Sequence, residues 1–158
     1  MKTIFSTLVG SRLYGTSIEG SDYDYKAVAL PDAEDLLGLR DTAREHWEVK
    51  NPNDTPGETV VYSVAKFLTL FMSGNPTVTE LVFSCPVYCP ETPHDLWTTL
   101  VKPFALHNLL SDKIVGSYGG YINDQFKRVK ARKAQNNREF MIEKYGFDIK
   151  CSGHVYRL

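Results

Sequence analysis

The sequence predicts an α+β fold, with a small mixed β-sheet in the N-terminal half and a helical region after it. Two observations predict this class: strand-like runs rich in β-branched and aromatic residues end at Ser63, and the later segments follow helical patterns. At 158 residues the chain has the length of one domain with a core of its own. We expect a sheet-bearing part over residues 1–84 and a helical part over residues 85–158.

Three strands are expected, over Thr3–Val9, Tyr23–Leu30 and Glu58–Ser63. The first ends at a glycine and the second is stopped by Pro31, which cannot donate to a ladder. Residues 31–57 hold many charges and turn residues, so we predict mostly loop there, with a short strand near Trp47.

Helices are expected after the third strand, beginning with Ser63–Ser73, which Gly74 stops. The next one starts with Asn75 as its N-cap and Pro76 at its first position. The three prolines of SCPVYCPETP predict a loop. Later helices are predicted over Leu96–Leu110, Ile114–Ala134, Arg138–Tyr145 and from Asp148, an N-cap that follows a stop at Gly146.

The net charge of −1 hides a polarity along the chain. Residues 1–60 hold six Lys and Arg against eleven Asp and Glu, whereas residues 121–158 hold nine against four. An acidic N-terminal part suits a metal site and a basic C-terminal part suits phosphate or nucleic acid. Two solvated faces of opposite sign explain the charges equally well.

Targeting and cysteine patterns favour a cytoplasmic protein. No apolar run approaches the ~20 residues that cross a bilayer, and the N-terminus lacks a signal-peptide pattern, so we expect no membrane partner. Three cysteines are too few for a disulfide framework. Cys85, Cys89 and His94 could be metal ligands, but small buried thiols are favoured because a second ligand pair at zinc-finger spacing is missing.

The stretch GSRLYGTSIEGSDYDYK holds two candidate halves of a site. If Asp22 and Asp24 lie in a strand, they project from one side about 7 Å apart along the backbone. Carboxylates within ~4 Å repel by about 4 kcal/mol at an effective dielectric near 20, and Mg²⁺ relieves that repulsion. Gly10 and Ser11, at a strand end that turns into a helix, offer backbone N–H groups and a hydroxyl to an anion.

Each half alone is better explained as an ordinary surface or Asx turn. Together, a Gly-Ser turn followed by Asp-x-Asp resembles the signature of the DNA polymerase beta-like nucleotidyltransferase superfamily. The blocks GSRLYG...SDYD, YSVAKFLTLFMSGNPTVTELVF and EKYGFDIKCSGHVYRL resemble a family of predicted phage and bacterial nucleotidyltransferases linked to RNA ligase and RNA repair. Such proteins tend to continue beyond HVYRL, so we expect a helical region that is minimal or cut short.

The resemblance implies that residues 1–84 form the catalytic core, in the host cytoplasm if the chain is phage-encoded. It also implies two metal ions, Mg²⁺ or alternatively Mn²⁺, held with the triphosphate of an NTP by Asp22, Asp24 and a third carboxylate. Glu58, at the head of the third strand, is our choice for that carboxylate, with Asp54 and Glu48 in reserve.

Basic residues near the C-terminus complete the expected site. Lys150, His154 and Arg157 fall at i, i+4 and i+7, on one face of a helix, and the resemblance favours their contact with the triphosphate over a solvated basic face. An RNA acceptor is the alternative to a solvated helix end for the cluster Lys127, Arg128, Lys130, Arg132 and Lys133. Glu80 is predicted to cap or pair structurally.

The predicted function is transfer of a nucleoside monophosphate from an NTP to an acceptor hydroxyl on RNA, a small molecule or a protein, with release of pyrophosphate. Asp22 and Asp24 would bridge the metals, Glu58 would help to take the proton, and Gly10-Ser11 would hold the β- and γ-phosphates. Two alternatives are an inactive fold of this kind that binds RNA or other partners, and a glycosyltransferase whose Asp-x-Asp pair holds a nucleotide-sugar.

Overall fold

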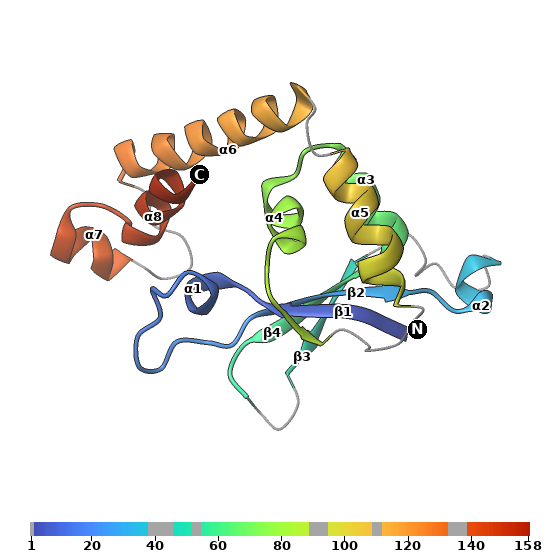
Figure 1. The fold of residues 1–158 in the computed structure, drawn as a ribbon. Helices are drawn as coiled ribbons and strands as arrows, with labels where there is room; N and C mark the ends of the chain where they lie inside the picture. Colours follow the sequence, from blue (N-terminus) through green and yellow to red (C-terminus); the bar gives the residue numbers. More distant parts are fainter. Residues whose placement is uncertain (1, 38–45, 52–54, 89–94, 109–111, 133–138) are drawn as a thin grey trace.

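The computed structural model describes residues 2–37, 46–51, 55–88, 95–108, 112–132 and 139–158. Its sheet has five strands in the order β3-β4-β2-β1-β5 (Figure 1). β2 and β4 are parallel and the other neighbours are antiparallel, so the predicted mixed sheet is confirmed. The strands are β1 Lys2–Leu8, β2 Tyr25–Leu30, β3 His46–Lys50, β4 Glu58–Ser63 and β5 Pro86–Tyr88.

β5 corrects the prediction of a loop over SCPVYCPETP. Pro86–Tyr88 pairs antiparallel with β1 at the edge of the sheet, where the missing N–H of a proline is tolerated. The buried hydroxyl of Thr7 donates to the carbonyl of Cys85 at 2.7 Å and fixes the entry to the strand. A segment from the predicted helical part therefore completes the sheet, while the division at residue 84 itself stays a prediction.

β2 begins at Tyr25, two residues later than predicted. The preceding backbone bonds to other segments: the N–H of Tyr23 donates to Pro56 O at 2.8 Å, and the carbonyl of Asp24 accepts from Val9 N at 2.8 Å. Asp22 and Asp24 thus precede the strand. The alternation of a strand does not fix the relative directions of their carboxylates.

Three helices begin at side-chain caps, of which Asn75 and Asp148 were predicted and Ser63 was not. Ser63, Asn75 and Asp148 each accept a hydrogen bond from the first turn of the helix they precede, and Gly74 adopts the left-handed φ of 74° that ends α3. The helical elements are α1 Gly10–Leu13, α2 Ala33–Leu36, α3 Val64–Met72, α4 Pro76–Thr79, a 3₁₀ turn Glu80–Val82, a π-helical turn Trp97–Val101, α5 Lys102–His107, α6 Asp112–Lys130, α7 Glu139–Tyr145 and α8 Ile149–Arg157.

One strand and one helix fall within residues 31–57, which were predicted to be mostly loop. β3 confirms the strand near Trp47, and α2 is a single turn that the prediction missed. A capping box between Asp32 and Asp35 stabilises α2. Four residues are too few for a helical hydrophobic period, so only the box could have revealed this turn.

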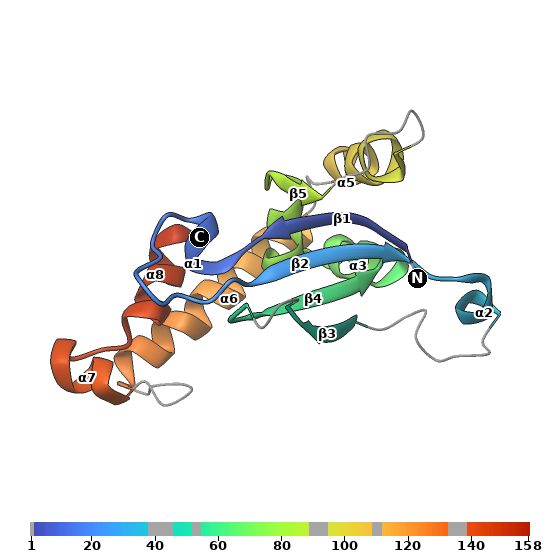
Figure 2. The same cartoon turned by 90° about the horizontal axis from the view of Figure 1, so that it is seen from below.

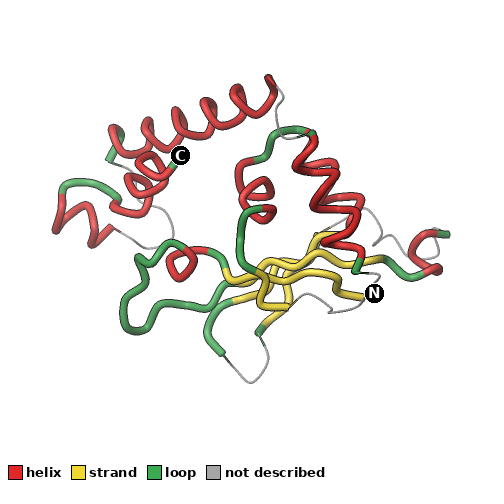
Figure 3. Tube along the Cα trace, in the orientation of Figure 1, coloured by secondary structure: helices red, strands yellow, loops and turns green. Residues whose placement is uncertain are grey.

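The core lies between the sheet and the helices α3, α4 and α5, which cover one of its faces (Figure 1). Phe5 of β1 stacks on Trp97 with ring centroids 4.0 Å apart, and Phe67 of α3 packs edge-on against the same indole. α7 and α8 lie beyond one end of the sheet, and α6 runs from α8 back to α4 (Figures 2 and 3).

The cysteine and membrane predictions have separate outcomes. Cys151 is buried as expected, but Cys85 is exposed, so the prediction of buried thiols is wrong for Cys85. Cys89 and His94, from the alternative metal set, lie outside the described residues. No helix in the described part of the chain has the length and apolar character that crossing a membrane requires.

Candidate active site

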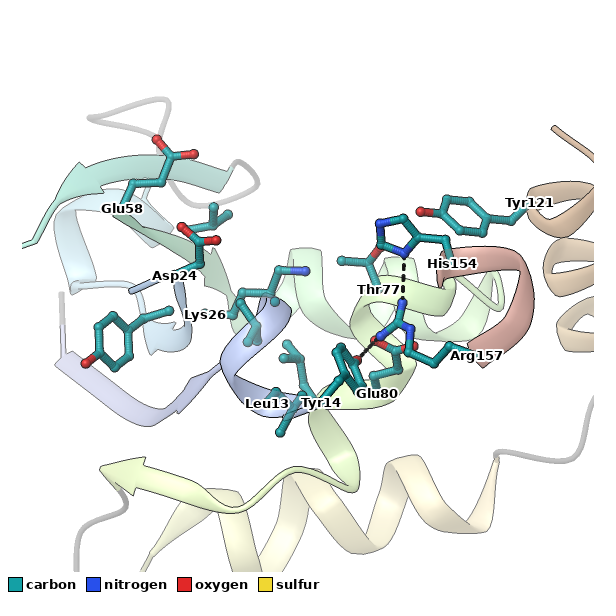
Figure 4. A pocket seen from close by; sticks show the side chains of 15 residues that line it. Leu13, Tyr14, Asp24, Lys26, Glu58, Thr77, Glu80, Tyr121, His154 and Arg157 are labelled. Carbon is teal, nitrogen blue, oxygen red and sulfur yellow. Dashed lines mark hydrogen bonds and ion pairs between the residues drawn. The ribbon is translucent and has the colours of Figure 1, made fainter. Parts of the chain in front are cut away.

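A pocket of about 290 Å³ lies between the strand ends and α8 (Figure 4). It brings together five predicted site residues from distant parts of the sequence: Gly10, Asp24, Glu58, His154 and Arg157. Lys26, Thr77, Glu80 and Tyr121 also line it, together with Tyr14.

Gly10 and Asp24 lie close together in the lining of the pocket. Gly10 has a left-handed φ of 66°, and a Cβ built on it would lie 3.2 Å from Asp24 Oδ2. A side chain at this position would therefore be strained and would crowd the carboxylate. Glycine allows the α1 turn to approach Asp24 this closely.

Glu58 lies beside Asp24 because β2 and β4 run parallel. Tyr25 pairs with Thr59, so the residues one step earlier, Asp24 and Glu58, lie level with each other. Figure 4 shows both carboxylates at the same end of the pocket. Neither side chain has a hydrogen-bond or ion-pair partner among the described residues.

Three predicted site residues lie outside the pocket lining: Ser11, Asp22 and Lys150. Asp22 is exposed, and its backbone carbonyl accepts a hydrogen bond from Arg12 Nε at 3.1 Å. Lys150 is exposed on the first turn of α8. Their parts in metal or phosphate binding stay predictions.

The predicted three-carboxylate set is not assembled in the structure. Within the described ranges, no three His, Cys, Asp or Glu side chains come close enough together to hold a metal ion. Of the reserve carboxylates, Glu48 is exposed on β3 away from the pocket, and Asp54 lies outside the described residues. Asp24 and Glu58 are therefore the two predicted metal ligands that face this pocket.

The segment that carries the aspartates is tied to the strand beside it. The buried Asn51 donates through Nδ2 to Tyr23 O at 2.6 Å and accepts from Thr59 Oγ1 at 2.9 Å. Gly57 lies so close that a Cβ there would be 2.3 Å from Tyr23 O. The prediction missed Asn51, because an asparagine in a Lys-Asn-Pro turn has no pattern that separates it from other turn residues.

Arg157 occupies the opposite side of the pocket and is held by three side chains. Its Nη1 pairs with Glu80 Oε2 at 3.1 Å, its guanidinium lies 3.9 Å from the Tyr14 ring centroid, and Nη2 is 3.2 Å from His154 Nδ1. Figure 4 shows this group together. The structural pairing predicted for Glu80 is confirmed.

Tyr14, the residue directly after α1, completes the group of side chains around Arg157. Its hydroxyl donates to Glu80 Oε2, and burial, followed by that hydrogen bond and the charge of Glu80, raises the pKa of the phenol well above its usual range. Tyr14 and Glu80 thus connect the Gly-Ser turn to α8. The sequence prediction missed Tyr14, although it stands in the block GSRLYG that carried the resemblance.

Lys26 of β2 projects between these two sides of the pocket (Figure 4). Burial lowers its pKa to about 8, and the charges of Glu80 and Asp24 oppose part of that effect. The prediction missed this residue. A lysine two positions after Asp24, in a strand that is otherwise apolar, was the available signal.

Comparison with known proteins identifies the family of the chain. A family model described as "RNA repair pathway DNA polymerase beta family" matches residues 1–158. The chain belongs to this family. The nucleotidyltransferase resemblance inferred from the sequence is thereby confirmed.

Two individual proteins show the extent of the similarity. The chain is 31% identical over 134 residues to an uncharacterized 38.9 kDa protein of Enterobacteria phage T4, covering 79% of this chain and 38% of that protein. A crystal structure of a nucleotidyltransferase-like protein from Exiguobacterium sibiricum aligns with 99% of this chain and 48% of its own, at 11% identity and a TM-score of 0.43. The chain therefore spans less than half the length of either protein.

Proposed function

We propose that this chain is a metal-dependent nucleotidyltransferase that moves a nucleoside monophosphate from an NTP to an acceptor hydroxyl. The observation that supports this most directly is the position of Gly10, Asp24 and Glu58 around one pocket. We place the triphosphate in that pocket, and the membership of the chain in an RNA repair pathway DNA polymerase beta family supports this choice.

The side chains present fit a divalent metal whose coordination the substrate completes. Asp24 and Glu58 offer hard oxygen donors that no described residue occupies. Mg²⁺ characteristically takes one or two carboxylates and keeps its other positions for water and phosphates. Bound Mg²⁺ or Mn²⁺ would neutralise charge on the triphosphate, and Asp22 is proposed as a further ligand in a two-ion site.

In the proposed reaction the acceptor oxygen forms a bond to the α-phosphorus. The bond from that phosphorus to the bridging oxygen breaks, and pyrophosphate leaves with the electron pair. Glu58 takes the proton of the acceptor hydroxyl, and the Gly10-Ser11 turn holds the β- and γ-phosphates through backbone N–H groups. Lys150, His154 and Arg157 are proposed to approach the triphosphate from α8.

We propose an RNA end, in the cytoplasm, as the acceptor. The last turns of α6 and the residues after it carry Lys127, Arg128, Lys130 and Arg132, while Lys133 lies outside the described residues. Lys127 is exposed and pairs with Asp124 at 3.8 Å, an interaction that salt screens easily. A phosphate backbone would compete for such side chains, and the family description, which names an RNA repair pathway, favours RNA over a small molecule or a protein.

The test supplies each NTP, labelled at the α-phosphate, with Mg²⁺ and a pool of RNAs, and measures label transferred to RNA. We expect transfer that EDTA abolishes and that Asp24→Asn lowers by roughly a hundredfold or more, because a group facing the developing charge is lost. Glu143→Gln, an exposed carboxylate on α7, is the matched control and should leave transfer unchanged.

Three other results would contradict this proposal or support one of its alternatives. Full activity in Asp24→Asn would refute this site. RNA binding without Mg²⁺–NTP binding in calorimetry would support the inactive RNA-binding alternative, and a thermal shift with UDP-sugars but not with NTPs would support the glycosyltransferase.

A further inference from the structure

Lys26 differs from the other cations of the pocket in having no partner. No ion pair or hydrogen bond joins its amine to another residue of the described ranges. Its side chain is half-buried on β2 and lines the pocket. A cation that is partly removed from water and has no direct hydrogen bond or ion pair within the described residues favours an anionic ligand.

Arg157 cannot offer its charge as readily. Glu80 pairs with its guanidinium, Tyr14 lies under it, and His154 contacts its other nitrogen. An anion that binds Arg157 must compete with the Glu80 carboxylate. Among the described residues that line the pocket, Lys26 is therefore the cation whose charge is available to a ligand without breaking a contact.

The arrangement of charges in the pocket also suits a nucleotide, because Lys26 lies between its two ends. Asp24 and Glu58 lie at one end of the pocket, the Arg157 group lies at the other, and the amine projects between them (Figure 4). A bare phosphate next to two carboxylates is repelled, whereas a phosphate chain that extends toward Lys26 meets an opposite charge.

We propose that Lys26 binds the triphosphate of the NTP, donating from its ammonium group to non-bridging phosphate oxygens. This inference rests on the proposed function and names a phosphate-binding residue for the same site. Arg157 has a second task besides the triphosphate contact proposed above, since its pair with Glu80, which also accepts from Tyr14, holds α8 against the α1 turn. Affinity should then depend on Lys26 in proportion to the number of phosphates bound.

The experiment is isothermal titration of the intact chain with ATP and with AMP, in Mg²⁺ and without an acceptor. Lys26→Met should raise the Kd for ATP by roughly tenfold or more, the effect of losing a charged hydrogen bond, and the Kd for AMP by less than about twofold. Lys26→Arg should recover part of the ATP affinity. Lys113→Met, an exposed lysine on α6, is the matched control.

Three results would overturn this inference, and one of them would also overturn the proposed function. Equal ATP affinity in wild type and Lys26→Met, with RNA labelling intact in the wild type, overturns this inference and leaves the proposed function standing. Equal losses for ATP and AMP indicate a structural part for Lys26 and also overturn it. A wild type that binds no Mg²⁺–NTP overturns the proposed function and this inference together. Should circular dichroism show that Lys26→Met is unfolded, Lys26→Gln repeats the ATP and AMP comparison with the same criteria.

Discussion

The two sides of the pocket hold their charged groups by different means. On the sheet side, the carboxylates of Asp24 and Glu58 have no partner among the described residues, and the backbone around them determines where they lie. On the helical side, Arg157 is held by the side chains of Glu80 and Tyr14. One side leaves its charges free for a ligand, while the other uses them to join elements.

This difference indicates which changes should damage each side. The sheet side depends on two close approaches: the backbone of Gly10 lies beside the Asp24 side chain, and the backbone of Gly57 lies beside that of Tyr23. An added Cβ at Gly57 would clash with the backbone of Tyr23, which cannot rotate away as a side chain can. The helical side depends on charge pairing and should respond instead to loss of a carboxylate or a hydroxyl.

Gly57→Ala should have the largest effect. The new Cβ would lie 2.3 Å from Tyr23 O, and the φ of 109° is one that alanine rarely adopts. We expect about 3 kcal/mol or more of destabilisation in urea unfolding, together with loss of NTP transfer as the aspartate segment shifts. Gly120→Ala on α6, with open space at its Cβ, is the control and should stabilise by about 0.5 kcal/mol.

Glu80→Gln should have an intermediate effect, confined to the helical side. It removes the charge that faces Arg157 but leaves an oxygen that can accept from Tyr14. We expect a loss of about 1–2 kcal/mol, because both partners are about a quarter exposed and solvent screens the pair. A double-mutant cycle with Arg157→Met measures the coupling energy between Glu80 and Arg157. A coupling energy of zero would contradict the inference that this pair holds α8 to the α1 turn.

Features of the fold and the site that depend on neighbouring residues could be predicted from the sequence. Strand and helix assignments followed local signals, such as the N-caps Asn75 and Asp148 and the stop at Gly74, which act within a few residues. Asp24 and Glu58 were found because a spacing pattern and a strand position marked them. Both kinds of signal are encoded in consecutive residues.

Long-range pairing was not predictable in the same way. β5 is a three-residue strand among prolines whose hydrogen bonds go to β1, 79 or more positions earlier. The roles of Asn51, Tyr14 and Lys26 depend on partners or a pocket that the fold brings together. Lys26 and Tyr14 had a local signal in the sequence, but that signal does not identify what they face. The Glu80 pair was predicted as structural, but only the fold identifies Arg157 as its partner.

Tyr14→Phe should have the smallest effect and separates the hydroxyl from the charge. The ring remains, so its contact with the Arg157 guanidinium at 3.9 Å is kept, and only the hydrogen bond to Glu80 is lost. Since Glu80 still pairs with Arg157, we expect a loss of about 0.5–1 kcal/mol in urea unfolding, well below that of Glu80→Gln. A loss in Tyr14→Phe as large as in Glu80→Gln would mean that the hydroxyl, rather than the ion pair, holds α8 to the α1 turn.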